Sequence, residues 1–123
     1  MPVPEDAKIV DKPWGREVWW AQSECYVAKV LEVSAHEALS LQYHERKRET
    51  VLVVAGEGGA RLGDLDVRLV PGVRLEVPAG VVHRFEAGGE PLVLLEVSTP
   101  EVEDVVRLED RYGRSPAARG AAG

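Results

Sequence analysis

Four residues of this sequence carry side chains that commonly bind metal ions: Gln42, His44, Glu49 and His83. Gln42 and His44 are two apart on one predicted strand, so their side chains point to the same face. Two imidazoles, a carboxylate and an amide oxygen suit a divalent transition metal such as zinc, iron, manganese, nickel or cobalt. Spacing alone also allows His44 to be a surface residue of the charged stretch HERKRE and His83 to be a hydrogen-bonded core histidine.

Short strands separated by glycine and proline turns would position these side chains. We expect strands at 26–33, 39–43, 51–55, 60–62, 65–70, 74–77, 82–86 and 92–97, with the apolar run VLVVA at 51–55 buried on both faces. Many short strands at this spacing are typical of an all-β sandwich or an antiparallel jelly-roll barrel. A jelly roll brings together strands far apart in sequence, so the four side chains could meet inside a barrel core of residues 26–98.

One helix is predicted after the last strand, at about residues 100–112. Thr99 can cap it, Pro100 suits its first position, and Gly113 can end it. We expect this helix to be a lid or brace at the edge of the barrel. The residues that follow, 115–123, are small and polar without periodicity and are expected to fray.

Composition limits the classes of protein to which the chain can belong. Its 123 residues and 13.5 kDa correspond to one domain, residues 1–123, and 45% hydrophobic with 29% charged residues is typical of a folded soluble protein. The net charge of −6 comes from acidic residues spread along the chain, which argues against a nucleic acid partner.

The location and the assembly of the protein follow from similar reasoning. The lone Cys25 can form no intrachain disulfide and fits a reducing compartment, so we expect a cytoplasmic protein. The sequence shows neither the apolar run of a signal peptide nor that of a membrane span, so no membrane association is expected. A small open jelly roll leaves strand edges and an apolar face to cover, which predicts a homodimer.

Two blocks of the sequence resemble the two motifs of the cupin superfamily. The block Gln42-x-His44-(four)-Glu49-(six)-Gly56 resembles the first motif, with glutamine in place of its first histidine, and Gly72-(five)-Pro78-x-Gly80-(two)-His83 resembles the second. The resemblance implies a small antiparallel jelly-roll barrel that holds a metal through those side chains.

Three further blocks narrow the resemblance to the cupin domain of type II mannose-6-phosphate isomerases, over about residues 12–114. They are KPWGRE at 12–17, LSLQYH at 39–44 and DVVRLEDRYGR at 104–114. The resemblance implies aldose–ketose isomerisation of a sugar phosphate through an enediol, with one divalent metal ion, zinc first among the candidates. The sequence departs from the family at 45–50, where a histidine-rich stretch is usual, and at Ala87, where asparagine is usual.

A phosphorylated substrate would need fixed cations near the barrel mouth. Arg107 lies in the tail block of the resemblance, which implies a catalytic and substrate-binding role for it. Lys29 lies on an otherwise apolar strand face and either binds substrate or pairs with a carboxylate such as Glu32. Arg84 follows His83 directly, so alternation points it outward.

Other noticeable residues have a simpler interpretation. Trp14, Trp19 and Trp20 are expected to pack at one end of the barrel. The basic run 46–48 is expected to form a solvated turn, although it could line the mouth and attract an anion.

Because a fold does not determine an activity, two alternatives stay open. One is a binding module for a sugar or metabolite that keeps the metal without catalysis. The other is a different metal-dependent cupin enzyme, such as a dioxygenase or an epimerase. Oxygen consumption with a redox-active metal would indicate the oxygenase, and affinity without product would indicate the binding module.

Overall fold

The computed structural model describes residues 3–113, which form eleven strands and no helix. The strands are β1 (Lys8–Lys12), β2 (Gly15–Gln22), β3 (Val27–Val33), β4 (Leu41–Tyr43), β5 (Glu49–Ala55), β6 (Gly58–Leu62), β7 (Leu65–Leu69), β8 (Arg74–Val77), β9 (His83–Ala87), β10 (Leu92–Ser98) and β11 (Val106–Glu109). All eight predicted strands are present, with bounds that shift by a few residues.

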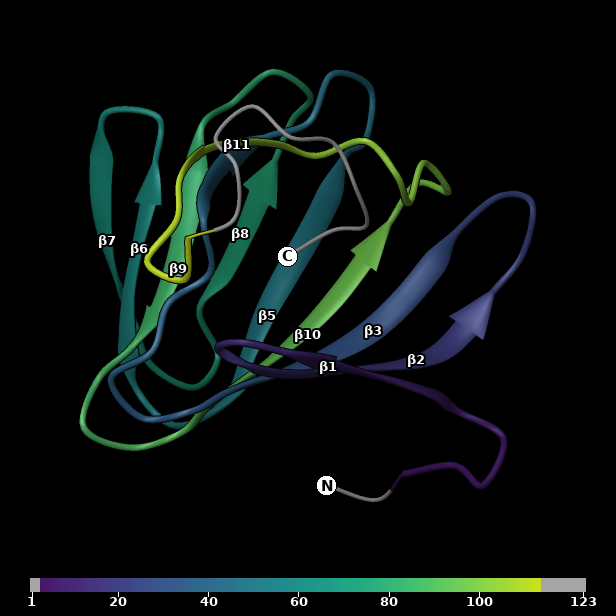
Figure 1. Cartoon of the computed structure of the whole chain (residues 1–123), viewed down its shortest axis with the longest axis horizontal. Helices are drawn as coiled ribbons and strands as arrows, with labels where there is room; N and C mark the ends of the chain where they lie inside the picture. The colour runs from purple at the N-terminus through teal and green to yellow at the C-terminus, as the bar shows by residue number, and fades with distance from the viewer. Residues whose placement is uncertain (1–2, 114–123) are drawn as a thin grey trace.

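Two antiparallel sheets face each other and enclose the core (Figure 1). The larger sheet has the order β1-β2-β3-β10-β5-β8, and the smaller has the order β11-β4-β9-β6-β7. Neighbouring strands such as β3 and β10, or β4 and β9, are far apart in sequence. This arrangement is the predicted all-β jelly roll, and it brings residues of the first and second motif together.

Alternation along each strand separates the core from the surface. Val51 and Val53 of β5 are buried against residues such as Phe85 of β9, whereas Leu52 and Val54 lie on the outer face and are partly exposed. The prediction that this strand is buried on both faces is therefore wrong. Full burial of a side chain such as Phe85 contributes about 2 kcal/mol, so the interior supplies the stability that supports the polar groups at one end.

The predicted helix at 100–112 is not present. This segment contains turns and the strand β11, in which Val106 and Arg107 pair with Tyr43 and Gln42 of β4. The Thr99 hydroxyl accepts a hydrogen bond from the backbone N–H of Arg48 at 3.0 Å. β4 would otherwise be an unpaired edge strand, and pairing with it makes this segment a strand although its local sequence favours a helix. The predicted frayed tail, 115–123, lies outside the described residues.

The N-terminal hairpin of β1 and β2 was not predicted from the sequence. Gly15 begins β2 with φ 151°, and a Cβ there would lie 1.9 Å from the backbone oxygen of Glu32, so only glycine fits. Trp14 and Trp19 are buried as expected. Trp20, at the bulge of β2, is 46% exposed, so packing does not account for it.

The outer face of the larger sheet carries one apolar row that crosses five strands. Its members are direct cross-strand partners: Ile9, Val18, Val30, Leu95 and Leu52. Within this row Ile9 and Leu52 are exposed, whereas Val18 and Val30 are already buried within the chain. The homodimer stays a prediction. Within residues 3–113, no helix is long and apolar enough to cross a membrane.

Candidate metal centre

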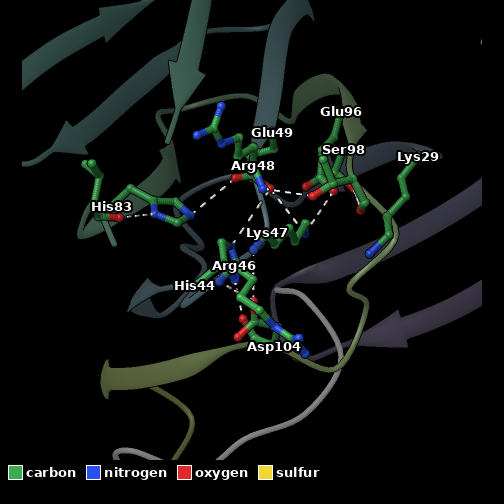
Figure 2. Close-up of polar contacts among 12 residues, drawn as sticks. Lys29, His44, Arg46, Lys47, Arg48, Glu49, His83, Glu96, Ser98 and Asp104 are labelled. Atoms are coloured by element: carbon green, nitrogen blue, oxygen red, sulfur yellow. Dashed lines mark hydrogen bonds and ion pairs between the residues drawn. The ribbon is translucent and has the colours of Figure 1, made fainter. Parts of the chain in front are cut away.

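The four predicted ligand positions lie at one end of the barrel, where the two sheets approach each other. Gln42 of β4 and His83 of β9 are direct cross-strand partners, His44 follows β4, and Glu49 begins β5. The imidazole centroids of His44 and His83 are 5.0 Å apart, and one ligand atom from each of His44, Glu49 and His83 lies within 4.8 Å of the other two (Figure 2).

A turn with a glycine in the left-handed region places His83 beside His44. Gly80 has φ 83°, which glycine adopts without strain. Its backbone N–H donates to the carbonyl oxygen of His44 at 2.7 Å. The turn that starts β9 is therefore tied directly to the residue that ends β4.

Both imidazoles are buried, with exposed fractions of 1% for His44 and 0% for His83, so the interpretation of His44 as a surface residue is wrong. The Nδ1 atom of His44 lies 2.7 Å from the carbonyl oxygen of Asp104, and that of His83 lies 2.9 Å from the carbonyl oxygen of Val81. A carbonyl only accepts, so Nδ1 carries the hydrogen in each ring. In the neutral form of each ring, Nε2 then carries the lone pair.

Both Nε2 atoms face the carboxylate of Glu49. His83 Nε2 lies 3.2 Å from Glu49 Oε1, and His44 Nε2 lies 3.9 Å from Glu49 Oε2. Among the described residues, neither Nε2 atom nor Gln42 Oε1 has a hydrogen-bond partner, although all three are buried. Buried acceptors that face one another are unfavourable unless a cation lies between them. The residues therefore fit a divalent metal ion.

The charges around the centre favour the ligating forms. Burial, followed by the nearby charge of Lys47, lowers the pKa of His44 to about 4, so its ring is neutral at pH 7. Burial opposes ionisation of Glu49, but the nearby charge of Lys47 favours it, and the pKa of this carboxyl is held well below its usual value. Neutral imidazoles and an ionised carboxylate are the forms that bind metal.

Lys47 and Glu96 extend the site, and our sequence analysis missed both. Lys47 is 1% exposed, and its Nζ lies 3.2 Å from Glu49 Oε2 and 3.2 Å from Glu96 Oε2. Burial lowers the pKa of Lys47, but the two carboxylates overcome this and raise it, so the ammonium stays charged. The solvated-turn prediction is thus wrong for Lys47, although Arg46 and Arg48 are exposed. Alternation from Val51 back through Glu49 would have found it.

The side chain of Lys29 is buried and contacts a carboxylate and an aromatic ring. Its Nζ lies 3.4 Å from Glu17 Oε1 and 4.0 Å from the ring centroid of Trp19, whose Nε1 donates to the same oxygen at 2.8 Å. Burial is the main cause of the lowered pKa of Lys29. The alternative that Lys29 pairs with a carboxylate is confirmed, but its partner is Glu17, because Glu32 lies on the other face of the sheet and binds Arg16 at 2.7 Å.

Two arginines take opposite faces of the smaller sheet. Arg107 is buried and lies directly opposite Gln42, which is itself opposite His83, so the three side chains form one row on the inner face. Arg84 points outward as predicted, because it lies between the buried His83 and Phe85 on β9. Its Nε donates to the carbonyl oxygen of Leu39 at 3.0 Å. Arg107 is therefore the arginine that adjoins the candidate metal centre.

The two-sheet barrel and the convergent His, Glu and His side chains define a cupin. A cupin-2 domain from Rhodospirillum rubrum superposes with a TM-score of 0.76 over 85% of this chain and 77% of its own, at 16% identity, which shows the shared fold. The model of the mannose-6-phosphate isomerase C-terminal family matches residues 4–110, and the chain belongs to this family.

Curated relatives agree with this assignment. Mannose-1-phosphate guanylyltransferase ManC of Salmonella typhimurium is 38% identical over 85% of this chain and 23% of its own length. Xanthan biosynthesis protein XanB of Xanthomonas campestris pv. campestris is 34% identical over 86% of this chain and 24% of its own. The chain thus spans about a quarter of the curated relatives that it matches.

Proposed function

We propose that this chain is a metal-dependent sugar-phosphate isomerase of the mannose-6-phosphate isomerase type. One divalent ion would be held by Gln42, His44, Glu49 and His83, with zinc as the first candidate and iron, manganese, nickel or cobalt as the others. The observation that supports this most is that the buried Nε2 atoms of His44 and His83, which have no hydrogen-bond partner among the described residues, both face the carboxylate of Glu49. Membership of the isomerase C-terminal family supports the choice of reaction.

When bound, the metal ion would supply a Lewis acid for the carbonyl and hydroxyl oxygens of an open-chain sugar. The protein contributes a second positive charge, because Lys47 is held ionised by Glu49 and Glu96 next to the ligand set. A fixed cation in a buried site stabilises negative charge that develops on oxygen. Lys47 would therefore favour the enediolate-like transition state of the isomerisation.

Arg107 would bind the phosphate group of the substrate. It lies in the same inner row as Gln42 and His83, and a guanidinium can bind a phosphate through two parallel hydrogen bonds. Lys29 is already engaged by Glu17 and Trp19, so we assign it to the structure rather than to the substrate. The phosphate would thus be held beside β11, with the reacting carbons toward the two histidines.

The test combines elemental analysis of untagged protein with an assay for interconversion of mannose 6-phosphate and fructose 6-phosphate. One metal per chain with turnover is expected. His83→Ala should lose both the metal and the turnover. The control His36→Asn should keep the metal and the turnover, because His36 is exposed and asparagine tolerates its φ of 64°. Metal without turnover would refute the isomerase in favour of a binding module or another cupin enzyme, and protein that cannot take up metal would refute the metal centre.

A further inference from the structure

The turn between two of the candidate ligands, His44 and Glu49, is held by a residue from a distant part of the chain, Asp104. Figure 2 shows its carboxylate below this turn. Oδ1 accepts the backbone N–H of Glu45 at 3.1 Å, and Oδ2 accepts those of Arg46 at 2.7 Å and of the next residue, Lys47, at 2.9 Å. One buried carboxylate thus satisfies three successive N–H groups.

The main chain of Asp104 makes a separate contact with the centre. Its carbonyl oxygen is the acceptor 2.7 Å from Nδ1 of His44. This hydrogen bond holds the hydrogen on Nδ1 and aims Nε2 at the centre. The side chain of Asp104 therefore shapes the turn, while its backbone sets the tautomer and orientation of the imidazole.

The strand that follows Asp104 supports a second ligand position. In β11, Arg107 pairs with Gln42 and Val106 pairs with Tyr43. Residues 104–109, which we call the C-terminal segment, thus contact the site at His44 through Asp104 and at Gln42 through β11. The C-terminal segment therefore contacts two of the candidate ligand positions without supplying a ligand itself.

We propose that Asp104 is a positioning residue of the metal centre, and that metal binding and docking of the C-terminal segment stabilise each other. This inference rests on the proposed metal site. Hydrogen-bond partners that orient metal ligands commonly change metal affinity by about 10–100-fold. Because linkage is reciprocal, an ion that prefers the docked arrangement also stabilises the docked segment.

The substitution that tests this role is Asp104→Asn in the full chain. Asparagine keeps the backbone carbonyl that faces His44 but replaces one carboxylate oxygen by an NH2 group, which opposes backbone donors. The matched control is Tyr112→Phe. The Tyr112 hydroxyl donates to Glu37 Oε2 at 2.5 Å and accepts from the backbone N–H of Ala38 at 3.2 Å, so it anchors the chain just beyond this segment, away from the turn.

We expect the Zn²⁺ dissociation constant of Asp104→Asn, measured by competition with a chelating dye, to rise about 10–100-fold, while Tyr112→Phe stays within about threefold of the unmodified chain. The increase of unfolding temperature on adding Zn²⁺ should shrink in Asp104→Asn alone, because this increase depends on the dissociation constant. The absorption bands of bound Co²⁺ should also change in that variant alone. A merely destabilised protein would keep its Co²⁺ spectrum.

Amide hydrogen exchange of the unmodified chain supplies a test that does not depend on a folded variant. Adding Zn²⁺ should slow exchange at 45–47 and at 106–109 together. Protection confined to 45–47, or equal Zn²⁺ affinity in Asp104→Asn and the unmodified chain, would overturn the inference. An equal loss of Zn²⁺ affinity in Asp104→Asn and Tyr112→Phe would also overturn the specific role of Asp104. An unmodified chain that binds neither Zn²⁺ nor Co²⁺ would instead refute the proposed metal centre itself.

Discussion

Lys29 of β3 and Glu96 of β10 lie directly opposite each other and both point into the interior between the sheets. Oε2 of Glu96 lies 3.2 Å from Nζ of Lys47, and Nζ of Lys29 lies 3.4 Å from Oε1 of Glu17. Acidic and basic groups thus alternate from the candidate metal centre into the larger sheet. Burial is the largest cause of the raised pKa of Glu96, with the charge of Glu49 next.

This arrangement predicts a large loss of stability when one charge is removed. Lys29→Met should lower the free energy of unfolding by about 3–5 kcal/mol, because Glu17 then keeps a buried charge without its cation. The double variant Lys29→Met with Glu17→Gln should recover more than half of that loss, since glutamine still accepts from Trp19. Urea unfolding at pH 7 measures both. A loss below about 1 kcal/mol in the single variant would contradict the buried pairing.

A second prediction concerns the acid stability of metal-free protein. The pKa of His44 is about 4 in the folded chain and 6.5 in its ordinary state. The unfolded chain therefore binds more protons between these values, and stability should fall as pH drops from about 6.5 to 4, by about 3 kcal/mol from this group. Urea unfolding at several pH values checks it. His44→Gln should flatten the dependence in this window, and an unchanged slope would contradict the assignment.

A third prediction tests the charge of the carboxylate ligand. Glu49→Gln keeps the size of the side chain but removes the ionised oxygen, so Zn²⁺ affinity should fall by at least about 100-fold. Glu76→Gln, an exposed residue of the neighbouring strand β8, is the control and should leave affinity unchanged. Equilibrium dialysis with metal analysis measures both. Full metal content in Glu49→Gln would exclude this residue from the ligand set.

A fourth prediction separates phosphate binding from metal binding. Arg107→Ala should weaken binding of mannose 6-phosphate about 10–100-fold, the range expected for a hydrogen bond to a charged group, and should leave the metal in place. Arg107→Lys should recover only part of the affinity, because lysine lacks the planar fork. Calorimetric titration with mannose 6-phosphate and with mannose measures the difference. An equal effect on the neutral sugar would contradict the phosphate role.

The sequence by itself predicted eight of the eleven described strands and the four candidate ligand residues. Alternation and turn residues predicted eight strands of the barrel, because a period of two follows from the pleated backbone. The spacing within the two blocks that resemble the cupin motifs indicated one candidate ligand set, namely Gln42, His44, Glu49 and His83. Local patterns of this kind survive folding because each depends on a few neighbouring residues.

The tertiary structure decided the features that depend on distant partners. Residues 106–109 form β11 instead of the predicted helix because β4 offers an unpartnered edge. Lys47 is buried because Glu49 and Glu96 meet its charge, and Lys29 binds Glu17 because the unpredicted β2 lies beside β3. Apart from the contact between Lys47 and Glu49, each of these interactions joins groups that lie far apart along the chain, so no local pattern encodes it. The orientation of the His44 ring by Asp104, sixty residues away, has the same origin.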